Sequence, residues 1–283
     1  MQSTKLMRNA GQIYLSLVPF IATFIAFVIG HSNYKIYLPI WIINVCFMII
    51  SAWILGAHAL KDSDNVEKKQ FAVIGLFLIV PWIFISVFAG IGVPPGSMKV
   101  WVGQATEEQV RFSILLMGGI LITLGLALLR EKLKASGENF YSLLGYTLIM
   151  MAIPLYLINI TFWHSFTLET FRTVVSSGLD QKPEWYQPAY KQVSLIIMIE
   201  VVLTYLATAC FAASLYSAGL FRKAPSRIYI IISLLAVLII LLTPFYPPSL
   251  READFPYTPF MIPAMAFLML YFIGINLLRK AGN

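Results

Sequence analysis

Residues 193–219 read VSLIIMIEVVLTYLATACFAASLYSAG, an apolar run with a single charged side chain, Glu200. A helix needs about 20 mostly apolar residues to cross the hydrocarbon core of a bilayer. The run is longer than that, so we predict that it forms a membrane-spanning helix. Cys210, Ser214 and Ala218 recur at every fourth position of the run. This spacing of small residues predicts a face on which a neighbouring helix packs closely.

Further apolar segments of similar length occur throughout the chain. They lie at about 12–30, 37–58, 71–92, 112–129, 141–163, 228–246 and 259–278. Each should be helical, because a backbone exposed to lipid must satisfy its own hydrogen bonds. The first segment follows Lys5 and Arg8, as in a signal peptide, but Gly30-His31-Ser32 is not a small-x-small cleavage site. We therefore predict an all-α, polytopic integral membrane protein with about eight transmembrane helices, the first of them retained.

The composition of the 283 residues supports this class. The chain is 59% hydrophobic and 12% charged, with a mean hydropathy of +0.80. Soluble domains carry roughly 25% charged residues. This composition excludes a soluble enzyme, a disordered chain and a nucleic-acid-binding module, so nucleic acid is not an expected partner despite the net charge of +7.

The distribution of basic residues predicts the orientation. If the N-terminus is cytoplasmic, 13 of the 20 Lys and Arg residues fall in the cytoplasmic segments and 7 fall outside. Short cytoplasmic loops carry the excess of Lys and Arg in membrane proteins. We therefore expect both termini on the cytoplasmic side. The expected location is the plasma membrane, which in a bacterium is the inner membrane.

The chain also shows signs of an internal duplication. Three pairs of landmarks recur in the same order: 125–130 with 274–279, 94–95 with 247–248, and 31–32 with 164–165. We predict two tandem four-helix repeats, residues 1–135 and 136–283. Four crossings are an even number, so the two repeats would have parallel orientation. The offsets differ mainly because of a long outer loop expected at about 166–190.

Polar residues deep inside the apolar segments are the candidate ligand-binding residues. Glu200 is the strongest candidate, because a charged group at the centre of a membrane helix costs about 2.5–3.5 kcal/mol and usually faces the bundle interior. Thr204 follows one turn later on the same face. The other deep candidates are Asn44, and Asn159 with Tyr156 and Trp163 near its face. A structural role, as a hydrogen bond between helices, is the alternative for each of them.

Two histidines complete the candidate site. His31 and His164 occupy matching outer ends of the first and fifth segments, where they could form a polar outer site. We expect no metal site, because metal sites usually gather more ligands than two histidines. Nothing in the sequence identifies a cofactor or a catalytic residue.

These features favour a protein that binds or transports a small or lipophilic molecule through a polar intramembrane pocket near Glu200. Its expected partners are the bilayer, a small lipophilic ligand and other protein subunits. Two alternatives stay open: a membrane subunit of a larger, quinone-linked complex, and a lipid- or isoprenoid-modifying membrane enzyme. The absence of a complete catalytic motif favours a protein that is not an enzyme.

Overall fold

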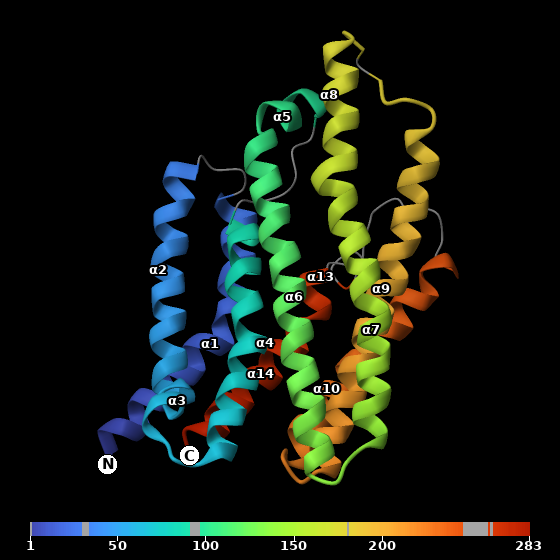
Figure 1. Cartoon of the computed structure of the whole chain (residues 1–283). Coiled ribbons are helices and arrows are strands. Elements are labelled where there is room, and N and C mark those ends of the chain that lie inside the picture. The colour runs from blue at the N-terminus through green and yellow to red at the C-terminus, as the bar shows by residue number, and fades with distance from the viewer. Residues whose placement is uncertain (1, 30–33, 91–96, 180, 246–259, 261–262) are drawn as a thin grey trace. The chain divides into compact units, whose positions relative to one another are not determined.

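The computed structural model describes residues 2–29, 34–90, 97–179, 181–245, 260 and 263–283 (Figure 1). All regular secondary structure in these residues is helical. The described residues form two compact units that interleave along the chain. Unit 1 comprises Met1–Gly125, Ile160–Glu184 and Tyr271–Asn283, and unit 2 comprises Leu126–Asn159 and Trp185–Leu270.

Five helical stretches are long and apolar enough to cross a membrane. They are Pro39–Asp62, Ala105–Ala135, Phe140–Ser176, Tyr186–Ser217 and Lys223–Leu242. The prediction of a multi-helical, apolar chain is thereby confirmed in its coarse form, and the total of eight spans stays a prediction. The expected segments 12–30 and 71–92 overlap α1 (Gln2–Ile29) and α4 (Val66–Gly90), which each end beside residues outside the description. The expected segment 259–278 overlaps α14 (Leu268–Ala281).

Unit 1 holds the first helices and most of the last one. After α1 come α2 (Tyr34–Ala52), the π-helical turn η1 (Trp53–Ala57), α3 (Ala59–Asp62), α4, α5 (Met98–Gly103) and most of α6 (Ala105–Ala135). The second π-helical turn η2 (Phe162–Thr167), α8 (Leu168–Ser176) and most of α14 complete the unit. The helical stretch therefore runs on to Ser176, and the loop expected from about residue 166 is wrong over these residues. The reason is that a π turn widens the helix without ending it.

The first and last helices of unit 1 meet at one end, where the N and C labels lie close together in Figure 1. Arg8 of α1 donates to the carbonyl oxygen of Arg279 at 3.2 Å and to Asn283 Oδ1 at 2.5 Å. The number of crossings, the side of the membrane on which the termini lie and the orientation of the repeats stay predictions.

Glycines let α4 and α14 pack with their backbones in contact. A methyl group on Gly274 would lie 2.8 Å from Leu78 Cβ and 3.0 Å from the carbonyl oxygen of Gly75. Real side chains do not approach this closely, so only glycine fits. Membrane helices commonly associate through such small residues, because close approach gains van der Waals contact where lipid offers no hydrophobic driving force.

Unit 2 is built around α9 (Tyr186–Ser217), which packs along α10 (Lys223–Leu242). The end of α6, most of α7 (Phe140–Thr161), the short turn η3 (Thr243–Phe245) and α13 (Pro263–Ala266) belong to the same unit. Its apolar core joins α9, α10 and α13 through Val201, Tyr205, Ala236, Val237, Ile240 and Ala266. Val201, the residue next to Glu200, belongs to this core.

The close-packing face predicted on α9 is confirmed at two of its residues. A methyl group on Gly145 of α7 would lie 3.1 Å from Cys210 Cβ and 3.2 Å from the carbonyl oxygen of Ala207. One turn further along α9, the Ser214 hydroxyl donates to the carboxylate of Glu138, just before α7. The small side chains on α9 therefore let α7 come close enough for direct polar contacts between the helices.

Candidate functional site

The structure joins two of the predicted site residues in unit 2. Asn159 Nδ2 of α7 donates to Glu200 Oε2 of α9 at 3.5 Å. Glu200 has no exposed surface and Asn159 is 3% exposed. The pair therefore links two apolar helices through a carboxylate and an amide that are both shielded from solvent.

The other carboxylate oxygen of Glu200 has no hydrogen-bond partner in the part of the chain that the structure describes. Oε1 is buried, and no donor among the described residues reaches it. An unsatisfied buried polar atom costs about 1–3 kcal/mol, and more for a charged group. Such atoms are rare in folded proteins, and each calls for an explanation such as a functional role. Oε1 is thus the atom of the site that remains available for an additional hydrogen bond or ion pair.

Thr204 lies on the same buried face of α9 as predicted, but its hydroxyl donates within the helix. Thr204 Oγ1 donates to the carbonyl oxygen of Glu200 at 2.9 Å, and Thr208 Oγ1 donates to the carbonyl oxygen of Thr204 at the same distance. Serine and threonine often bond in this way to the carbonyl one turn earlier. The two hydroxyls can still accept hydrogen bonds, so they add acceptors to the face that Glu200 dominates.

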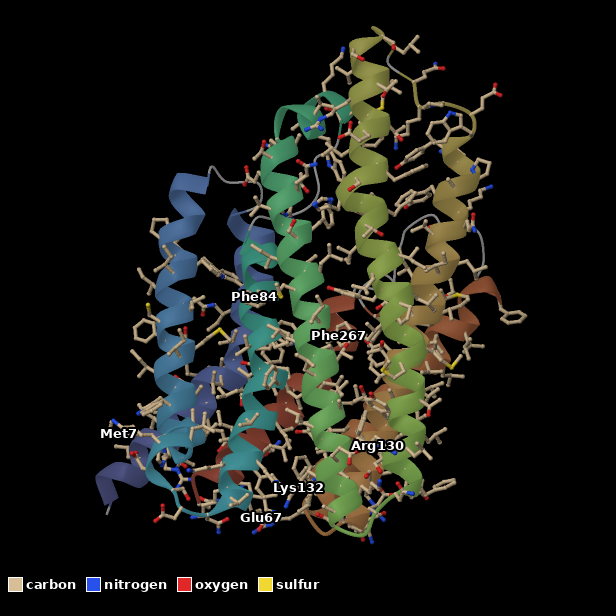
Figure 2. All side chains as sticks on the ribbon, viewed as in Figure 1. Met7, Glu67, Phe84, Arg130, Lys132 and Phe267 are labelled. Atoms are coloured by element: carbon tan, nitrogen blue, oxygen red, sulfur yellow. The ribbon has the colours of Figure 1, made fainter. Side chains whose placement is uncertain are left out.

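Tyr156 brings an aromatic ring to the same site. It lies one turn before Asn159 on α7, is 3% exposed and interacts electrostatically with Glu200. Its ring meets the ring of Phe267 edge to face at a centroid distance of 5.7 Å; Phe267 is labelled in Figure 2. The site therefore consists of the Glu200 carboxyl group, the Asn159 amide and the aromatic ring of Tyr156.

Asn44, in unit 1, has different neighbours. Its Oδ1 accepts a hydrogen bond from the Tyr14 hydroxyl of α1 at 2.8 Å, and its Nδ2 lies 3.7 Å from Met48 Sδ. These contacts join α1 to α2. The structure thus gives Asn44 the interhelical partner that the sequence analysis offered as its alternative role.

Trp163 and His164, also in unit 1, lie in the π-helical turn η2. His164 Nε2 lies 3.2 Å from Ser113 Oγ of α6, and Nδ1 lies 2.7 Å from Ser165 Oγ. The Trp163 ring lies 5.9 Å from that of Trp101, a buried residue of α5. Trp163 thus contacts α5, and His164 contacts α6. His31 lies outside the described residues.

The sequence analysis did not predict a buried ion pair that lies near the start of α6. Arg111 donates to Glu108 Oε1 at 2.5 Å, and both side chains are almost fully buried. The spacing of three residues between opposite charges was the signal that could have found the pair, because residues i and i+3 share one helix face.

A second missed feature is the carboxylate of Glu138 at the N-terminus of α7. Gly137 has a φ of +85° and turns the chain between α6 and α7. Glu138 then accepts hydrogen bonds from the backbone N–H groups of Tyr141 at 2.7 Å and Ser142 at 3.1 Å, and one from the Ser214 hydroxyl. Partial burial alone would raise its pKa, but these hydrogen bonds outweigh burial and lower the pKa below its ordinary value.

Comparison with known proteins finds no match to a family model, to a curated protein or to a solved structure. Among the described residues, no three His, Cys, Asp or Glu side chains are placed to hold a metal ion together. The function of the chain therefore has to be inferred from the geometry around Glu200.

Proposed function

We propose that this chain is a multi-pass membrane protein that binds a small or lipophilic molecule between α7 and α9, and transports it through this site. Glu200, with Asn159, would provide the polar contacts. Tyr156 would provide an aromatic one. The observation that carries the proposal is the fully buried Glu200 carboxylate, whose Oε1 atom has no partner among the described residues.

The location of the carboxylate supports binding over a purely structural role. A structural carboxyl group in an apolar interior lowers its energy by using all its hydrogen-bonding capacity, since every unsatisfied atom costs free energy. Glu138, in the same unit, behaves in this way and uses both carboxylate oxygens. Glu200 instead leaves Oε1 without a partner among the described residues, and this oxygen would accept the contact of a ligand.

The test is native mass spectrometry of the protein extracted gently from its own membrane. We expect one small molecule per chain in the wild type, and its loss in Glu200→Gln, which removes the charge and keeps the shape. Glu131→Gln is the matched control, because Glu131 is exposed and pairs with Arg130 near the end of α6. Arg130 is labelled in Figure 2. It should retain the molecule.

Two results would contradict the proposal. One is the same occupancy in the wild type and in Glu200→Gln. The other is a chain that carries no small molecule but copurifies with a second protein subunit, which would favour a membrane subunit of a larger complex.

A further inference from the structure

A negative charge on Glu200 would have no counter-charge in the part of the chain that the structure describes. Its side-chain contacts there are the neutral amide of Asn159 and the electrostatic interaction with Tyr156 of α7. Tyr156 is thus a titratable side chain on a neighbouring helix, α7, that interacts with Glu200. Tyr205, on α9 itself, donates its hydroxyl to the carbonyl oxygen of Phe260. Among the described residues, no Lys, Arg or His is a partner of Glu200.

A carboxyl group in this position has two ways to avoid an isolated buried charge. It can hold a proton and become neutral, or it can pair with a cation from outside the protein. The neutral acid still leaves one oxygen atom, Oε1, without a hydrogen-bond partner. A bound cation at Oε1 would remove both costs at once, because it neutralises the charge and provides the missing contact.

The surroundings indicate which kind of cation fits. Small metal ions need several oxygen, nitrogen or sulfur ligands, and no group of three potential metal-ligating side chains occurs among the described residues. An organic cation needs a single counter-charge and gains from aromatic and apolar contact. Tyr156, whose ring meets that of Phe267, provides an aromatic side chain, and Val201, next to Glu200, is fully buried in the apolar core.

We infer that the ligand at Glu200 is a lipophilic organic cation, and that it binds in exchange for the proton of the Glu200 carboxyl group. This inference rests on the proposed function and names its substrate class. In the exchange, the O–H bond of the carboxylic acid breaks, the proton leaves to water and the carboxylate pairs with the cation. The charge inside unit 2 is therefore the same before and after binding.

This exchange has two measurable consequences. Each bound cation releases about one proton when Glu200 starts protonated, by the linkage between protons and ligand. The apparent affinity then rises about tenfold for each pH unit over the range where the acid form dominates, because protons compete with the cation. Binding of a neutral molecule of the same shape shows neither effect.

The experiment measures equilibrium binding of tetraphenylphosphonium to the full chain in detergent, with a pH indicator in weak buffer to record proton release. Triphenylphosphine oxide is the neutral comparison. We expect the cation to bind the wild type with release of about one proton, and Glu200→Gln to weaken binding at least about 30-fold. Glu131→Gln, which removes an exposed carboxylate of the same charge, should bind as the wild type does.

Glu200→Asp keeps the carboxyl group and should retain proton release, with weaker binding. Size-exclusion chromatography checks that each variant is folded. If a variant misfolds, the number of protons that the wild type releases on binding the cation still tests the exchange. The inference is overturned if the wild type does not bind the cation, if binding releases no proton, or if Glu200→Gln binds it equally well. If Glu200 instead retains a neutral molecule in native mass spectrometry, the proposed function holds and the cation inference alone fails.

Discussion

Replacement of Glu138 by glutamine tests the polar junction between α7 and α9. At neutral pH, the carboxylate accepts hydrogen bonds from two backbone N–H groups and from the Ser214 hydroxyl. Hydrogen bonds to a charged group contribute roughly 1.5–3 kcal/mol each. The glutamine oxygen retains part of this network, while its NH₂ group faces donors. We therefore expect Glu138→Gln to lower the free energy of unfolding by about 2 kcal/mol.

The effect should depend on pH with a defined sign. The pKa of Glu138 is lower in the folded protein than its ordinary value, so the folded state prefers the charged form. The stabilisation is complete above the ordinary pKa of a glutamate, about 4.3, and is lost as the pH falls through the lower folded-state pKa. The stability gap between wild type and Glu138→Gln should therefore narrow on acidification.

Thermal or denaturant unfolding in a single detergent, from about pH 7 to below the ordinary glutamate pKa of about 4.3, measures this gap. Ser214→Ala should remove about 1 kcal/mol, and the double variant should lose less than the sum of the single variants, because both residues share one hydrogen bond. Glu131→Gln is the control and should lie within about 0.5 kcal/mol of the wild type. A gap that is absent at neutral pH, or that widens in acid, would refute this account of Glu138.

Three further substitutions test the packing within unit 1. Gly274→Ala should destabilise the protein by about 1–3 kcal/mol, since the new methyl group meets the Gly75 carbonyl oxygen at 3.0 Å; an unchanged melting temperature would argue against this backbone contact. Tyr271→Phe should cost about 1 kcal/mol, because the buried hydroxyl donates to the Leu15 carbonyl oxygen at 2.6 Å, and denaturant titration would show it. Trp101→Ala should cost about 3–5 kcal/mol through loss of its buried ring contacts, and an effect below 1 kcal/mol in the same titration would contradict that packing.

Hydropathy was sufficient to predict the helical fold of the described residues. Runs such as 193–219 are long and apolar enough to cross lipid as a helix, in which the backbone satisfies its own hydrogen bonds. The continuation of α7 through η2 into α8 could not be predicted in the same way, because residues 166–176 include charged and polar side chains. Tertiary contacts there, among them the edge-to-face ring packing of Phe171 on Trp101, support a helix that local sequence does not require.

The candidate site could be predicted only in part, because the sequence shows which residues are polar but not how the helices pack. Glu200 was evident from the sequence, because a lone carboxylate in an apolar run is costly wherever the helix lies. Its pairing with Asn159 was not predictable, since the relative rotation of two helices depends on side-chain packing across them. The same reason applies to two other contacts. The hydrogen bond of Asn44 with Tyr14 depends on how α1 and α2 pack, and that of Glu138 with Ser214 depends on how α7 and α9 pack.

The most direct test of the central claim is infrared difference spectroscopy of the protein with and without tetraphenylphosphonium. The account predicts that the cation removes a protonated carboxyl band and adds a carboxylate band, and that both changes vanish in Glu200→Gln and persist in Glu131→Gln. Unchanged carboxyl bands in the wild type when the cation is bound, or the same changes in Glu200→Gln, would contradict the assignment of Glu200 as the binding group.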